Sequence, residues 1–301
     1  VGVAIGGSVA VNVVSNRTTA FISDSDIGTA EDPVGLIALT ADGNSRIWAL
    51  TIAGSLSVGY GKSQFGGAVA GSVAGSVNAV YNTVEAGIAD SSVVGTAGLS
   101  ISAEDETAII ANAFGGSLSV GAGKTGLAMA VGGSFAVNSI GNTVSSYVDG
   151  SEIDIDGELA IVSSSESAIW SLALGAAVGV GVGSAGGSGA SLSIGASVAW
   201  NTIGNTTESY IKDSNSILTG GGNVSVRAAD NASIKALAMA ASVSLGVGKG
   251  SAGVALSGGG SVAQNVIAST GNAFIDNSSL GSETSPVGSV DLDASGTSEI
   301  L

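Results

Sequence analysis

The chain has 301 residues, of which 49 are Gly and only 2 are Pro, and it contains neither Cys nor His. These absences exclude thiol nucleophiles, His-based catalytic triads, zinc sites and disulfides, while a net charge of −16 opposes binding to nucleic acid or to an anionic membrane surface. The composition, 45% hydrophobic and 11% charged, is too apolar for intrinsic disorder, and the lack of a Gly-X-Y period excludes collagen.

One sequence block recurs five times along the chain. It first reads GSVAVNVVSNRTTAFISDSDI from Gly7, and it returns at Val73, Gly133, Ala196 and Gly260. The first Asn of successive copies are 66, 60, 63 and 64 residues apart. The chain is therefore predicted to be a single array with a unit of about 62 residues. The units are 1–27 (partial), 28–93, 94–153, 154–217, 218–280 and 281–301 (partial).

Within a unit, the apolar residues alternate with a period of two, which indicates strands and no helix. In chain order, the third copy has an Asn-containing strand (134–138), a turn (149–151), a strand (159–163) and then two long strands joined by a Gly-rich turn (172–200). Short strands that return at a fixed long period are typical of coils stacked along an axis. The fold class predicted is all-β, a right-handed parallel β-solenoid (β-helix).

A unit of this length fits either three small rungs or one large flattened coil with an extended two-stranded arm. Because strands stack about 4.8 Å apart, one coil per unit brings equivalent residues into contact, whereas three rungs separate them by about 14 Å. Equivalent positions do match, which favours one large coil. An aromatic column, interrupted by Gly87, comprises Phe21, Tyr147, Tyr210 and Phe274, and the next position holds Ile22, Ile88, Val148, Ile211 and Ile275. We expect a stacked surface column beside an inward aliphatic column.

Two asparagine columns are the main candidate sites, and both are expected to be structural. The first comprises Asn12, Asn78, Asn138, Asn201 and Asn265. The second, four residues later, comprises Asn16, Asn82, Asn142 and Asn205, with Ser269 breaking the series. Stacked amides can form hydrogen bonds along the axis. The alternative is that these residues occupy turns and adopt the left-handed backbone conformation.

Candidate ligand sites are weaker. Lys62, Lys124 and Lys249 follow Gly-rich turns, but the phosphate-loop pattern is incomplete and no helix follows, so these lysines are expected to solvate the turn and to protect its edge. Acidic residues gather at 24–26, 104–106, 149–158 and 291–293. Calcium suits such oxygen ligands, but the known calcium-loop patterns are absent. No cofactor is predicted, and weak calcium binding at a coil edge stays open.

An enzyme is not expected. A carbohydrate-cleaving site needs paired carboxylates, and in β-helix proteins these act with Arg or Lys. The chain has three Arg, each in a different setting, and no copy departs from the repeat. The alternative is a carbohydrate-binding or carbohydrate-cleaving β-helix. Trp48 and Trp170 share one repeat position on the face opposite the core, where they could contact a partner chain or a sugar, or cover a neighbouring coil. The uncharged stretch 172–200 lacks an aromatic girdle, so membrane insertion is not expected.

The recurrent GGSVAVNxIxNxTxAYIxxSxI block continues into GxLxIxAxxxSxI and a GSLSVGxGK arm. In this pattern the sequence resembles the repeats of very large bacterial surface and secreted proteins, the filamentous-haemagglutinin-like and leukotoxin-type repeat adhesins. The resemblance covers all 301 residues and concerns architecture rather than activity. It implies an extracellular shaft at the bacterial cell surface, with a role in adhesion, cell–cell contact or filament formation. The partners expected are other copies or further repeats, joined end to end, and a cell-surface or glycan target.

Overall fold

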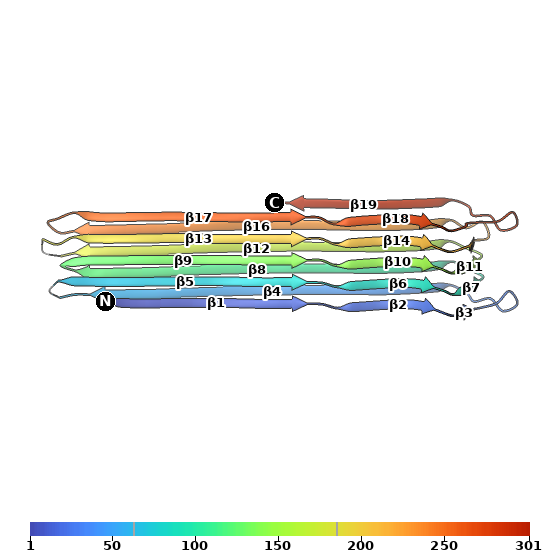
Figure 1. The fold of residues 1–301 in the computed structure, drawn as a ribbon, viewed down its shortest axis with the longest axis horizontal. Helices are drawn as coiled ribbons and strands as arrows, with labels where there is room; N and C mark the ends of the chain where they lie inside the picture. The colour runs from blue at the N-terminus through green and yellow to red at the C-terminus, as the bar shows by residue number, and fades with distance from the viewer. Residues whose placement is uncertain (63, 185) are drawn as a thin grey trace.

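The computed structural model describes residues 1–62, 64–184 and 186–301 and consists of four parallel β-sheets. Strands recur about every 62 residues, and the repeats stack as a β-solenoid (Figure 1). The two termini lie in the first and the last coil, at opposite ends of the stack (Figure 1). The predicted all-β class, a parallel β-solenoid of stacked repeats, is confirmed.

Each coil contributes one strand to each sheet, with the exception of the last coil in the smallest sheet. Sheet A contains β1 (Gly2–Val14), β5 (Phe65–Val80), β9 (Thr125–Ile140), β13 (Gly189–Ile203) and β17 (Gly253–Ile267). Sheet B contains β2 (Arg17–Ser23), β6 (Thr83–Ala89), β10 (Thr143–Asp149), β14 (Thr206–Lys212) and β18 (Thr270–Asp276). Sheet C contains β3 (Asp26–Ile27), β7 (Ser92–Gly95), β11 (Glu152–Ile155) and β15 (Ser216–Leu218). Sheet D contains β4 (Ile37–Tyr60), β8 (Leu99–Gly123), β12 (Leu159–Gly183), β16 (Val224–Gly248) and β19 (Val290–Ile300).

The register shows one large coil per repeat, and the alternative of three small rungs is wrong. Equivalent residues of successive units pair directly in parallel ladders, as Asn78 does with Asn138 and Tyr147 with Tyr210. The same register holds along the whole of β8 and β12. Residues that match between successive repeats are therefore direct neighbours in the structure, and each column consists of similar side chains in contact.

Sheets B and C and the first half of sheet D enclose a hydrophobic core, which we call the body. Its inward positions hold branched aliphatic side chains that are fully buried, among them Ile88, Ile153 and Ile161. The predicted inward column is confirmed here, since Val148 and Ile211 are also fully buried. Burial of such side chains stabilises each by about 1.5–3 kcal/mol.

Sheet A and the second half of sheet D form a flat two-layer extension, which we call the arm (residues 1–14, 47–80, 109–140, 169–203 and 234–267) (Figure 1, left). The two long strands of a unit form the predicted two-stranded arm, but they are not hydrogen-bonded to each other as a hairpin. β8 pairs with β4 and β12, and β9 pairs with β5 and β13. The two strands instead lie in opposite layers, because stacking already satisfies their backbone groups.

The two layers of the arm approach closely because their facing residues are almost all Gly, Ala and Ser. In β8 and β9 these inward residues include Ala113, Gly115, Ala130 and Gly132. A Cβ atom added to Gly115 would lie only 1.8 Å from the carbonyl oxygen of Gly133 in the opposite layer. At the base of the arm a second core cluster is still aliphatic, with Ile109, Ile140 and Ile169 buried between the layers. Beyond it the larger apolar side chains point outward, an arrangement opposite to that of the body.

Most of the variation in unit length lies in two connections. One is the arm tip, where sheet D leads into sheet A between Tyr60 and Phe65, Gly123 and Thr125, Gly183 and Gly189, and Gly248 and Gly253. The other joins sheet C to sheet D at 28–36, 96–98, 156–158 and 219–223. Left-handed glycines occur there, for example Gly28 with φ 74° and Gly221 with φ 93°. The strands between these connections keep their register.

Candidate functional site

The first asparagine column forms a continuous ladder along the solenoid axis. The Nδ2 amide of each residue donates to the Oδ1 of its counterpart in the next coil over 2.7–2.8 Å. The members are Asn12, Asn78, Asn138, Asn201 and Asn265. All lie within sheet A, and Asn78, Asn138 and Asn201 are almost fully buried. The three inner amides, those of Asn78, Asn138 and Asn201, each donate and accept within the column, so the column ties the coils together without a ligand.

The second column bonds differently. The Oδ1 atoms of Asn82, Asn142 and Asn205 accept the backbone N–H of the preceding coil's residue over 2.9–3.3 Å. Ser269 does not break the series, because its hydroxyl accepts from the N–H of Asn205 over 3.2 Å. Neither column has left-handed backbone geometry, which occurs instead at Asp24, Asp90, Asp213 and Asn277 among the described non-glycine residues. The left-handed conformation expected in the alternative is therefore wrong for both columns, although the second column does lie in the two-residue connections between sheets A and B.

The Nδ2 groups of the second column point into the body and meet a buried carboxylate. Asp105 is 3% exposed and accepts from Asn82 at 2.9 Å, from Asn142 at 2.6 Å and from the Thr107 hydroxyl at 2.8 Å. Burial raises the pKa of the Asp105 carboxyl, and the three hydrogen bonds oppose the rise. Asp230, two coils on, accepts from Asn205 in the same way at 3.2 Å.

Sequence reasoning missed this buried site. It placed Asp105 in a surface cluster with Glu104 and Glu106, which the structure separates: the two glutamates point outward and Asp105 points inward. The signal was the strand's period of two, since Asp105 shares the inward parity of Ala103 and Thr107.

The aromatic column lies on sheet B. The rings of Tyr147 and Tyr210 stack at 5.3 Å and 11°, and those of Tyr210 and Phe274 at 5.1 Å and 6°. Phe21 is separated from these three by Gly87 and is 63% exposed. The Tyr147 ring covers Gly87, since a Cβ atom there would lie 2.5 Å from ring carbons. Desolvation and neighbouring acidic groups raise the pKa of Tyr210 to about 12.

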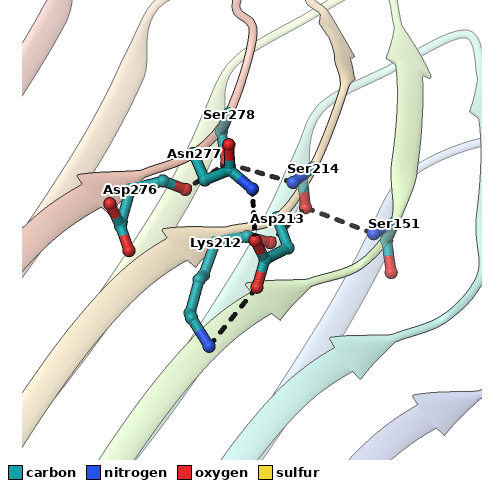
Figure 2. Close-up of polar contacts among 7 residues, drawn as sticks. All are labelled: Ser151, Lys212, Asp213, Ser214, Asp276, Asn277 and Ser278. Atoms are coloured by element: carbon teal, nitrogen blue, oxygen red, sulfur yellow. Dashed lines mark hydrogen bonds and ion pairs between the residues drawn. The ribbon is translucent and has the colours of Figure 1, made fainter.

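A serine ladder at the turn between sheets B and C was not predicted as such. In Figure 2 the Ser214 hydroxyl accepts from the N–H of Ser151 over 3.2 Å, and the Ser278 hydroxyl accepts from the N–H of Ser214 over 3.1 Å. Each hydroxyl also donates to the carbonyl oxygen two residues earlier, at 2.8 Å from Ser214 to Lys212. The sequence did single out these turns, and the signal was the serine present in every copy: Ser25, Ser91, Ser151, Ser214 and Ser278.

The residue before each serine is left-handed, and in three of the five copies it is an aspartate: Asp24, Asp90 and Asp213. Asp213 accepts from the Asn277 amide at 2.6 Å and pairs with the Lys212 ammonium at 3.3 Å (Figure 2). These contacts lower the pKa of the Asp213 carboxyl. The side chains of Asp213, Lys212 and Asn277 are accessible to solvent, and their contacts hold successive turns together at this edge. Among the described residues no group of three or more acidic side chains is arranged to hold a metal ion.

Charge is strongly segregated between body and arm. All 24 acidic residues lie in the body, whereas the only charged side chains of the arm are Lys62, Lys124 and Lys249 at its tip and Lys235 at its base. On the outer face of sheet D, Asp42, Glu104, Glu106 and Glu166 line a pocket of about 260 Å³. No Lys or Arg contributes to this pocket in the part of the chain that the structure describes, so the paired-carboxylate chemistry of a glycosidase has no basic partner there.

The tryptophans at the base of the arm point outward, as the alternation predicted. Trp48 is 76% exposed and Trp170 is 55% exposed. The Lys235 ammonium of the next coil lies 5.5 Å from the centroid of the Trp170 ring, a cation–π contact between neighbouring coils. Over the described residues, no helix has the length and apolarity that crossing a membrane requires.

Comparison with known proteins gave no relative. No family model, no curated protein and no solved structure matches this chain. The parallel β-solenoid with asparagine ladders is thus established from the geometry alone, and membership of an adhesin family stays a prediction.

Proposed function

We propose that this chain is a structural shaft or fibre module of a bacterial surface or secreted protein, supporting adhesion, cell–cell contact or filament assembly outside the cell. The observation that carries the proposal is the uninterrupted axial pairing. Four sheets, two asparagine columns, a serine ladder and an aromatic column all run along the same axis. This role requires no catalytic or ligand-binding site, because a shaft acts through its stiffness.

The two ends of the stack support end-to-end assembly. β1 and β2 at one end, and β17, β18 and β19 at the other, each have a pairing partner on one side only within the described chain. Strand edges of this kind pair readily with another chain. Because every sheet is parallel and every column repeats, a further coil of the same type would find matching partners at either end.

Electron microscopy and fibre diffraction of the purified chain test the proposal. We expect filaments with an axial repeat of about 4.8 Å. Adding bulky, charged substitutions to an end strand, for instance Val9→Lys with Val11→Lys in β1, should shorten the filaments while internal coils keep their secondary structure. Compact particles without axial order, at all concentrations, would contradict the proposal.

A carbohydrate-binding shaft is the second candidate, favoured by the exposed Trp170. That side chain borders a hollow of about 500 Å³, together with Ile110, Asn112 and Leu237. Aromatic faces flanked by amide groups suit sugar rings. A glycan array in which Trp170→Ala loses a signal that the unsubstituted chain gives would favour this candidate; an array without any signal would rule it out.

A further inference from the structure

The outer face of sheet D in the arm is apolar and has a regular relief. Two ridges run along the solenoid axis, one residue of each per coil. They are Ile52, Phe114, Leu174 and Met239, and Leu56, Leu118, Val178 and Val243. Between them lies a column of small residues, Gly54, Gly116, Ala176 and Ala241, which forms a groove. The hollow at this groove measures about 560 Å³.

Nothing in the described part of the chain covers this face. Ile52 is 64% exposed and Leu56 is 62% exposed in β4, and even in β8, which has neighbours on both sides, Leu118 is 38% exposed. A contiguous apolar surface of this extent marks an interaction site in soluble proteins. The face spans 13 residues from Trp170 to Val182 and four strands, about 40 Å by 19 Å, or roughly 800 Å². This is the area that each partner of a stable protein complex buries.

The relief and the charges together point to a second copy of the same chain. A ridge of one copy fits the groove of another if the arms lie antiparallel, with Phe114 over Gly116. Lys124 lies eight residues beyond Gly116, and Glu106 lies eight residues before Phe114. In this register the tip lysine of each copy therefore reaches the level of Glu106 in the other.

In this register Lys124 and Glu106 meet twice, once in each direction. In the neighbouring coils, Lys62 faces Asn44 and Lys249 faces Asn231, which pair with Glu106 and Glu166 of the adjacent strand. The flanking tip lysines therefore lie one strand spacing, about 4.8 Å, from the level of an acidic residue of the pocket. The tip and the body belong to the same continuous sheet (Figure 1). A two-fold axis parallel to the shaft produces both matches at once and makes the interface self-complementary.

We propose that two solenoids pack side by side through the outer face of sheet D, with antiparallel arms and with the tip lysines of each against the body acids of the other. The contact is lateral, so it is distinct from the end-to-end contact of the proposed function and does not rest on it.

Filling the groove tests the apolar part. A Cβ atom at Gly54 or Gly116 meets nothing within 4 Å, so Gly54→Ile with Gly116→Ile leaves the monomer intact. The matched control is Gly7→Ile with Gly71→Ile, two equally open positions on the outer face of sheet A. In sedimentation velocity, we expect the groove variant to raise the dimer dissociation constant by about 100-fold, roughly tenfold for each overpacked position, and the control to leave it unchanged.

Zero-length carbodiimide cross-linking tests the charge register. Lys124 and Glu106 are separated by 18 residues of one straight strand, about 60 Å, so any bond between them joins two chains. We expect cross-linked peptides that contain Lys124 and either Glu106 or Glu166. Lys124→Glu should abolish them, and combining it with Glu106→Lys should restore a cross-link at the swapped positions.

Each outcome decides the proposal. Paired shafts in micrographs that become single in the groove variant, together with the expected cross-links, support it. Shafts that stay paired in the groove variant, pairing lost in the sheet A control, or single shafts at every concentration overturn it. Flotation with phosphatidylcholine–phosphatidylglycerol vesicles by chains that do not pair would assign the face to lipid and would also overturn it. Filament length, which reports on the proposed function, is scored separately from filament pairing.

Discussion

Two adjacent glycines in β8 should respond in opposite ways to the same added methyl group. Gly115 faces the opposite layer of the arm, and Gly116 faces outward. At Gly115 a Cβ atom would lie 1.8 Å from the Gly133 carbonyl oxygen and 2.7 Å from its carbon. At Gly116 there is nothing within 4 Å. Neither glycine has a positive φ, so the comparison isolates the packing of the two layers.

The expected magnitudes follow from these distances. Because the obstructing atom is backbone, Gly115→Ala forces the layers apart by more than 1 Å locally, and overpacking of this kind costs about 1–3 kcal/mol. Gly116→Ala only removes freedom from the unfolded chain and stabilises by about 0.4–1 kcal/mol. The two variants should therefore differ by about 1.4–4 kcal/mol, with opposite signs relative to the unsubstituted chain.

Native-state hydrogen exchange is the suitable assay, since repeat arrays do not always unfold in one step. Amide protection in β8, β9 and β12 should fall in Gly115→Ala and be kept or raised in Gly116→Ala, while the body core around Ile161 changes little. Equal protection in the two variants would refute the inference that the layers are held at backbone contact.

Three further predictions concern the columns. Ser214→Ala removes one acceptor and one donor of the serine ladder and should lower the free energy of unfolding by about 1–3 kcal/mol, read from urea denaturation; Ser214→Thr keeps the hydroxyl and is the control. The pKa of the Asp105 carboxyl is raised above 3.8, so the folded state binds the proton more tightly and stability should fall as the pH rises just above that value; Asp105→Ser should remove this slope, and an unchanged slope would assign it to other groups. Tyr210 should ionise with a pKa of about 12 in ultraviolet titration, and stability should fall between pH 10 and about 12; a normal value, or no change in Tyr210→Phe, would contradict the stacked, desolvated ring.

The solenoid architecture could be predicted from the sequence because stacking makes equivalent residues of successive repeats neighbours. Asn78 and Asn138 are the same residue type because the amide of one donates a hydrogen bond to the amide oxygen of the other. This requirement keeps asparagine at the same position of each repeat, so the repeat period can be recognised from the sequence alone. The single large coil followed from the same reasoning. The inward aliphatic column, for example Ile88 and Ile211, was found by its alternation with the aromatic column.

Other features were hidden because sequence alone does not say what lies opposite a residue. Glu104, Asp105 and Glu106 read as one acidic surface run, although strand parity sends the middle residue into the body. The Gly-rich turn indicates that two long strands follow each other in the arm. It does not show that each strand is hydrogen-bonded to the equivalent strands of the neighbouring coils. The groove at Gly116 depends on the contrast between two faces of one strand, which the composition of that strand does not show.

The confinement of length differences to two corners has a consequence for how such arrays diversify. Residues added at the arm tip or between sheets C and D leave every ladder in register, so the entropic cost of an insertion there grows only slowly with its size. These corners are also exposed on the flank of the stack, where loops commonly acquire recognition roles. A scaffold of this kind can therefore gain a new epitope in one copy at a time, with an invariant frame beneath it.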